Sequence, residues 1–330
     1  MGMNTENRPL HFADAHKIRD VRFFTGAVGF FALAGRALNV VIGFQIYRLT
    51  HSVLALGWLG LVEAIPAISL VFFGGYAADH FDRKKILLTT RASSVLCAVF
   101  LALFSMGNHG GSLAGLYSMI FLAGVARGFA DPANTAFEAQ VVPRHLTVNA
   151  SSWITSTWLS CAVLGPAAIG FIFDAWGPVG SYLMIAACFV FSWGCTAVIS
   201  TKPRPVQEKR EPIFQSLTAG WSFVFKNEPL LGALALDLFA VLFGGAVALL
   251  PVYANDILHV GAKGLGFLNA APSLGAIVVT LIATRHAPVG RAGRNLLLAV
   301  SGFGVSILIF AFSKNFWLSM GALFFSGVLF

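Results

Sequence analysis

The sequence predicts an all-α protein that crosses a membrane many times. Of its 330 residues, 57% are hydrophobic and only 11% are charged, and the mean hydropathy is +0.78. A soluble domain carries about 25% charged residues. The chain also divides into ten apolar runs separated by polar breaks, and one helical crossing of a bilayer needs about 20 apolar residues. This composition excludes an ordinary cytosolic enzyme and a disordered chain.

The apolar runs give the expected helices in chain order. Gly and Pro inside them are compatible with membrane helices, because neighbouring helices satisfy the freed backbone groups. The runs cover residues 23–47, 53–77, 86–106, 113–136, 150–173, 179–200, 229–252, 264–284, 295–313 and 316–330. The longest polar break lies between the sixth and seventh runs. We therefore expect a six-helix half over 1–200, a cytoplasmic linker over 201–228 and an incomplete second half over 229–330.

The basic residues indicate the orientation. If the N-terminus is inside, 17 of the 22 lysines and arginines fall in the N-terminal segment and in every second break, counting Arg91 with the break after the second run. Cytoplasmic loops carry such an excess of Lys and Arg. The net charge of +8 is thus a topology signal that needs no nucleic-acid partner. We expect a cytoplasmic N-terminus.

An internal repeat relates the two halves. Pro66 and Asp79 are 13 residues apart, as are Pro272 and Arg285, and the pairs are offset by 206 residues. Repeated halves joined by a linker are a transporter architecture, with the substrate cavity at the repeat interface. Two complete halves need about twelve spans. Because the last run ends while still apolar, we expect about two spans to be missing.

The loop between the second and third runs resembles the signature loop of the major facilitator superfamily. It reads GGYAADHFDRKK, with His80 and Asp82 where Arg and Gly are usual. The matching positions are Gly75, Asp79, Arg83 and Lys84. In addition, residues 237–276 and 288–297 are similar to a bacterial branch of that superfamily that includes enterobactin-type siderophore exporters. The resemblance covers nearly the whole chain.

The resemblance implies a fold of two parallel six-helix halves and a loop that closes the cytoplasmic side as a gate. The residues allow the same interpretation. Gly75 lets two helices approach closely, while Asp79 and Arg83 can cap helix ends or pair across the bundle. The alternative is that the basic residues only enforce the topology.

A second motif lies in the fifth run. LGPAAIG resembles the family's antiporter motif through Gly165, Pro166 and Gly170, although Cys161 and Ile169 replace two of its glycines. Gly-Pro removes a helix hydrogen bond and leaves a groove for close packing, which suits a hinge. An ordinary kink in a packed bundle is the alternative reading.

Ionisable groups inside the apolar runs are candidate functional residues, because a charge at the centre of a bilayer costs about 2.5–3.5 kcal/mol on insertion scales. Burial favours a protonated carboxylate and a nearby cation favours an ionised one, so these groups could load and release protons. Arg127 also lies where the family has an arginine motif linked to proton coupling. The alternative is a set of structural ion pairs. The polar candidates are Arg36, Asn39, Glu63, Arg127, Asp131 and Asp237.

These features lead to one preferred function. We expect a proton-coupled secondary transporter that exports a small amphiphilic molecule, a siderophore or a drug, by alternating access. Uptake of a small metabolite and a non-transporting membrane sensor or scaffold are the alternatives. The expected location is a bacterial inner membrane, and the expected state is a monomer in the lipid bilayer. The cysteines and histidines lack metal-site spacing and there is no phosphate-binding P-loop, so we expect no metal, no cofactor and no enzyme.

Overall fold

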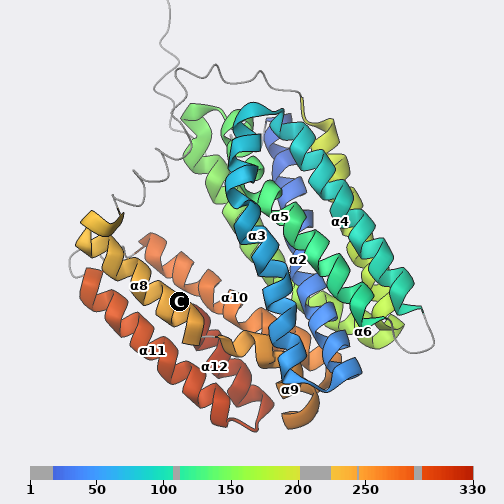
Figure 1. Ribbon diagram of the computed structural model, residues 1–330. Coiled ribbons are helices and arrows are strands. Elements are labelled where there is room, and N and C mark those ends of the chain that lie inside the picture. The colour runs from blue at the N-terminus through green and yellow to red at the C-terminus, as the bar shows by residue number, and fades with distance from the viewer. Residues whose placement is uncertain (1–17, 107–111, 201–223, 244, 286–291, 330) are drawn as a thin grey trace, which may run out of the picture. The chain divides into compact units, whose positions relative to one another are not determined.

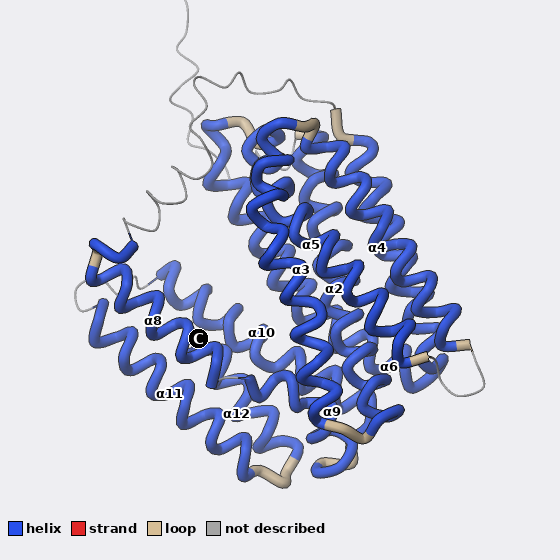
Figure 2. Tube along the Cα trace, in the orientation of Figure 1, coloured by secondary structure: helices blue, strands red, loops and turns tan. Residues whose placement is uncertain are grey.

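A computed structural model describes residues 18–106, 112–200, 224–243, 245–285 and 292–329 (Figures 1 and 2). Within these ranges the chain forms helices and connections and contains no strand. The predicted all-α class is confirmed. Most of the expected linker, residues 201–223, lies outside the described residues, as do the N-terminal Arg8 and Lys17.

The first six apolar runs fold into five long helices. These are α2 (Arg19–Thr50), α3 (Val53–His80), α4 (Arg83–Ser105), α5 (Leu113–Val141) and, after the short turn η2 (Arg144–Leu146), α6 (Thr147–Val198). Helix α6 contains two of the predicted runs. At Gly177, between them, the backbone is non-helical with φ 64°, a conformation that glycine adopts without strain. The expected break is therefore a glycine kink.

The later runs form helices and several short turns. They are α8 (Glu228–Phe243), η3 (Gly245–Leu249), α9 (Leu250–Val252), the π-turn η4 (Tyr253–Ile257), α10 (Gly261–Arg285), α11 (Ala292–Phe312) and α12 (Phe316–Leu329). The run 229–252 is not one continuous helix, because regular α-helix ends at Phe243. Two glycines at 244–245 and Pro251 follow in the sequence, and both residue types disfavour helix interiors.

Within the described residues, seven helical segments are long and apolar enough to cross a membrane, judged by length and composition. They are α2, α3, α4, α5, the η2–α6 segment, and parts of α10 and α11. Helices α8 and α12, with 16 and 14 residues, are shorter. The chain is a multi-pass membrane protein.

The chain divides into two compact units. The first comprises Met1–Lys202 and Pro251–Ala270, and the second Pro203–Leu250 and Ala271–Phe330. The segment Pro251–Ala270 thus packs with the first unit although it lies late in the sequence. The three-part division expected from the sequence stays a prediction.

Helix α2 is the most enclosed span of the first unit. In its most apolar window 61% of residues are buried, against 17% for α3. A core cluster surrounds its beginning, where Phe24 meets Phe137 of α5 edge to face with ring centroids 5.9 Å apart. The beginning of α2 therefore lies in the core of the first unit.

The internal repeat has a counterpart in the packing of each unit. A Cβ atom at Gly124 of α5 would lie 2.8 Å from Cγ of Pro66 in α3, and a Cβ atom at Gly327 of α12 would lie 2.7 Å from Cα of Pro272 in α10. In both units the repeated proline therefore meets a glycine from the helix two spans later. This equivalence supports the predicted duplication.

Candidate functional site

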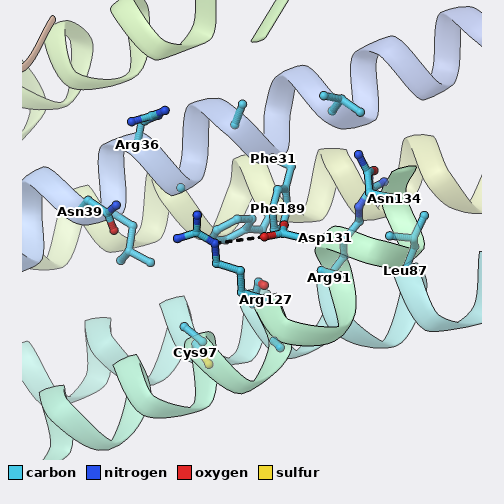
Figure 3. A pocket seen from close by; sticks show the side chains of 18 of the residues that line it. Phe31, Arg36, Asn39, Leu87, Arg91, Cys97, Arg127, Asp131, Asn134 and Phe189 are labelled. Carbon is cyan, nitrogen blue, oxygen red and sulfur yellow. Dashed lines mark hydrogen bonds and ion pairs between the residues drawn. The ribbon is translucent and has the colours of Figure 1, made fainter. Parts of the chain in front are cut away.

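A pocket of about 300 Å³ lies within the first unit, between α2, α3, α4, α5 and α6 (Figure 3). Five of the six polar candidates line it, namely Arg36, Asn39, Glu63, Arg127 and Asp131. The sixth, Asp237, has an exposed side chain on α8 in the second unit and is not among the lining residues. The sequence analysis therefore identified most of the polar lining of one pocket.

Arg127 holds two carboxylates at once. Its Nη1 atom lies 3.1 Å from Oε1 of Glu63. Its Nε atom lies 3.3 Å from Oδ2 of Asp131, and Figure 3 shows this second ion pair. The first contact joins α5 to α3, and the second joins residues four apart on α5. The side chain of Glu63 is 27% exposed, and those of Arg127 and Asp131 are 58% and 63% exposed. The predicted Arg127–Asp131 pair is thus part of a three-residue cluster.

Glycines on α5 set the approach of this helix to α3. Gly124 faces the backbone oxygen of Glu63, and a Cβ atom at Gly128 would lie 3.0 Å from the backbone oxygen of Ala67. Gly74 of α3 faces the backbone oxygen of Gly128. Small residues four apart allow membrane helices to meet through their backbones. This glycine seam, Gly74, Gly124 and Gly128, places Arg127 beside Glu63.

Arg36 occupies a different part of the pocket. Its guanidinium lies 4.9 Å from the ring centroid of Trp158 on α6, and in Figure 3 it lies apart from the Arg127–Asp131 ion pair. The side chains of Arg36 and Asn39 are both exposed and line the pocket. A Cβ atom at Gly165 would lie 2.8 Å from the backbone oxygen of Leu33, so this glycine brings α6 against α2 at Arg36.

Arg91 is a pocket residue that the sequence analysis missed. It lies in α4, is 3% exposed and lines the pocket with its partner Asn134. Its guanidinium donates to the backbone oxygen of Ser192 at 3.3 Å and to Oδ1 of Asn134 at 3.4 Å, and it lies 5.8 Å from the ring centroid of Phe31. Counting Arg91 with the loop charges was wrong. Its place inside the run 86–106 was the available signal.

The predicted gate loop joins three helices. Arg83 pairs with Asp79 at 3.8 Å and donates to the backbone oxygens of Ala78 at 2.8 Å and Ala136 at 3.2 Å. Asp82, which departs from the family pattern, caps α4 by accepting from the backbone nitrogen of Lys84 at 3.0 Å. The loop thus links α3 and α4 to α5.

The contacts of two residues in the predicted gate differ from those expected from the sequence. The close helix approach expected at Gly75 lies at Gly74 instead, because a Cβ atom at Gly75 would meet nothing within 4 Å. Lys84 donates to the backbone oxygens of Ala197 at 2.8 Å and Ile199 at 2.6 Å. It therefore neutralises the end of α6, where helix carbonyls lack partners. A gating role for these residues stays a prediction.

The residues of the expected hinge form close contacts. A Cβ atom at Gly170 would lie 2.7 Å from the backbone oxygen of Ala262, and Gly266 of α10 faces the backbone oxygen of Pro166. The backbone of α6 keeps helical angles through Gly165 and Pro166. The groove for close packing is present, and hinge motion stays a prediction.

The pocket combines charged groups with aromatic walls. Phe31 and Phe189 meet at a centroid distance of 5.4 Å, and Trp158 lies beside Arg36. No group of three metal-ligating side chains occurs among the residues that the structure describes. A pocket with apolar walls and a few polar groups suits a small amphiphilic molecule.

Apolar helices around a charged pocket are the architecture of a membrane transporter. The sequence model of the Major Facilitator Superfamily matches residues 24–330, and the chain belongs to this family. It is 28% identical over 277 residues to the enterobactin exporters EntS of Shigella boydii serotype 18 and Escherichia coli O139:H28. These alignments cover 83% of this chain and 65% of each relative, so the chain spans about two thirds of their length.

Solved structures share the fold. A bacterial homologue of the human lysosomal transporter Spinster, in an inward-facing and unoccupied conformation, matches with a TM-score of 0.68 and 14% identity over 94% of this chain and 73% of that one. A D-xylose–proton symporter matches with a TM-score of 0.65 and 13% identity over 94% and 79%. At these identities the likeness concerns the fold alone.

Proposed function

We propose that this protein is a secondary transporter that exports a small amphiphilic molecule, a siderophore or a drug, in exchange for protons. The observation that carries the proposal is the Glu63–Arg127–Asp131 cluster in the pocket of the first unit. A structural ion pair needs one carboxylate, whereas here one guanidinium holds two through different nitrogen atoms. Such an arrangement suits repeated exchange of partners.

The cluster provides a chemical route for proton coupling. A carboxylate beside a guanidinium is stabilised in its ionised form, and a carboxylate left without a cation in an apolar site takes up a proton. If Arg127 turns toward Asp131, Glu63 loses its partner and binds a proton. If Arg127 turns back, the proton leaves. Alternating access would link these two states to the two sides of the membrane.

The nature of the cargo and the direction rest on two supports. The relatives named above are enterobactin exporters, which favours export of an iron chelator or a similar molecule. A pocket of about 300 Å³ lies at the lower end of the range for small-molecule sites and is lined by Phe31, Phe189 and Trp158. It suits one aromatic portion of such a cargo.

The proposal includes a location and an orientation. We place the protein as a monomer in the inner membrane of a bacterium, with its N-terminus and the Arg83–Lys84 loop in the cytoplasm. The distribution of basic residues supports this orientation. Cysteine scanning of the Arg83–Lys84 loop and of Ser52 tests it. A membrane-impermeant thiol reagent should label only the Ser52 variant in intact spheroplasts.

Metabolite analysis tests the proposed export. Cells with the gene for this protein present or deleted are grown under iron starvation, and small molecules in the medium and in the cells are compared by mass spectrometry. A molecule that disappears from the medium and accumulates in the deleted cells would establish export and its cargo class. A molecule that instead remains in the medium and is depleted in those cells would establish uptake. No difference would contradict siderophore export.

A further inference from the structure

We propose that Arg36, Asn39 and Trp158 form a subsite for an anionic group carried on an aromatic ring of the cargo. This inference rests on the proposed transport function and specifies its substrate class as aromatic carboxylates. The juxtaposition that supports it is a guanidinium on α2 held over the indole of α6 at the pocket wall.

The charges of the pocket single out Arg36. Three arginines line it, and two are already engaged: Arg127 by two carboxylates, and Arg91 by two hydrogen bonds at 3% exposure. Within the described part of the chain, Arg36 contacts no carboxylate, and it makes a cation–π contact with the Trp158 ring. A cation inside a membrane bundle without a counter-ion is costly. An anion from the cargo would supply that counter-ion.

The geometry prepares Arg36 for such a ligand. Contact with the face of the indole holds the guanidinium at the pocket wall, and its N–H groups can bind a carboxylate through two parallel hydrogen bonds. Asn39 follows three residues later on α2, on the same helix face, and its amide adds a donor. Gly165 permits this close packing of α6 on α2, since a Cβ atom at its position would lie 3.4 Å from Cβ of Arg36.

The walls favour an aromatic anion over a compact inorganic one. Phe31, Phe189 and Trp158 line the same pocket, and ring surfaces prefer to bury another ring. The carboxylates of Glu63 and Asp131 are held by Arg127, so they do not compete with the ligand for Arg36. The subsite therefore combines one available cation with apolar surface.

Binding of radiolabelled probes by equilibrium dialysis tests the subsite. Salicylate carries both the ring and the charge, salicylamide has the ring without the charge, and acetate has the charge without the ring. We expect the purified protein in detergent to bind salicylate most tightly. Arg36→Gln should weaken salicylate binding about tenfold or more, because hydrogen bonds to charged groups contribute that much. Salicylamide binding should stay unchanged.

A matched control lies on the same helix. Arg48 also sits over a ring, 5.8 Å from the Phe44 centroid, but it is not among the lining residues of the pocket, so Arg48→Gln should bind all three probes as the wild type does. Asn39→Asp provides a second variant should Arg36→Gln fold poorly. Its added carboxylate should neutralise Arg36 and weaken the binding of salicylate, while the binding of salicylamide stays unchanged.

The outcomes separate this inference from the proposed function. Equal affinity for salicylate and salicylamide, or unchanged salicylate binding in Arg36→Gln and Asn39→Asp, would overturn the subsite. Equal affinity for acetate and salicylate would overturn its aromatic part. Because dialysis involves no gradient, these results hold whether or not the metabolite comparison demonstrates export.

Discussion

The hydroxyl of Tyr47 donates a hydrogen bond to the carboxylate of Asp256, a residue 209 positions further along the chain. Tyr47 lies near the end of α2 and is 3% exposed, while Asp256 lies in the π-turn η4 outside the candidate spans. An ion pair of Lys263 with Asp174, at 2.8 Å, joins the start of α10 to α6. These two contacts attach the segment Pro251–Ala270 to the first unit.

The Tyr47–Asp256 contact predicts a pH-dependent stability. The pKa of Asp256 is lowered from its ordinary value of 3.8, mainly by the hydrogen bond that Tyr47 donates to the ionised carboxylate and secondly by the one from Asn255. A lowered pKa stabilises the folded state above about pH 5, and the contribution is lost as pH falls through the folded value. Tyr47→Phe should lower the melting temperature at pH 7 and have a smaller effect at pH 3.

The matched control is Tyr117→Phe, which removes the hydrogen bond that the Tyr117 hydroxyl donates to the backbone oxygen of Ala55 at 2.8 Å, a partner that does not titrate. Its melting temperature should differ from wild type equally at both pH values. If Tyr47→Phe lowers the melting temperature by the same amount at pH 7 and at pH 3, the role of Asp256 ionisation is contradicted.

Neutralising Glu63 should uncouple transport from protons. Glu63→Gln keeps the size of the side chain and a hydrogen-bond acceptor for Arg127 but cannot bind and release a proton. In proteoliposomes, export driven by a pH gradient should fall to the rate measured without a gradient, while exchange of labelled for unlabelled cargo continues. Glu138→Gln, at the end of α5 and outside the pocket, is the control and should transport normally.

Asp237 is tested in the same assay. Asp237→Asn should also reduce gradient-driven export if this second carboxylate of the sequence analysis takes part in coupling. Wild-type export by the double variant Glu63→Gln and Asp237→Asn would exclude both residues from the mechanism.

The glycine seam predicts opposite effects for the same substitution at two sites. Gly124→Ala would place a methyl group against the backbone of Glu63 and the ring of Pro66, and such overpacking costs about 1–3 kcal/mol. Gly60→Ala on α3 adds its methyl group in open space and should stabilise the helix by up to about 1 kcal/mol. Thermal unfolding in detergent measures both. Equal melting temperatures would mean that α3 and α5 are not in backbone contact.

Lys84 should contribute more to stability than its neighbour Lys85. Lys84→Met removes two hydrogen bonds to the end of α6, which should lower the free energy of unfolding by about 1–3 kcal/mol. Lys85 has an exposed side chain, so Lys85→Met should change it by less than about 0.5 kcal/mol. Equal decreases in the free energy of unfolding would show that the charge of the loop, rather than the hydrogen bonds of Lys84, determines the stability.

The sequence was sufficient for features that depend on local pattern. Hydropathy located the helices, and the rarity of charge in a bilayer identified Arg36, Glu63, Arg127 and Asp131 as unusual residues, which one pocket then brings together. The spacing of Arg127 and Asp131 also predicted their pairing, because residues four apart meet on a helix. These conclusions need no knowledge of which helices are neighbours.

Features that depend on helix neighbours were out of reach. Arg91 resembles a loop charge until Ser192 and Asn134, from two other helices, surround it. Gly74 and Gly75 are equivalent in sequence, and only the position of Gly128 shows which one faces α5. The third partner of the ion cluster, Glu63, comes from α3 and could be assigned to Arg127 only once these helices were placed together.

The glycine seam also determines how fast the ion cluster can change. Helices that meet through backbone atoms do not slide past one another without a collective rearrangement, and such motions take microseconds to milliseconds. Side chains as exposed as Arg127 change rotamer within nanoseconds. We infer that rotation of the Arg127 side chain changes its contacts many times during each large movement of the protein. The contacts of Arg127 with Glu63 and Asp131 therefore form and break while the backbones of α3 and α5 stay in place.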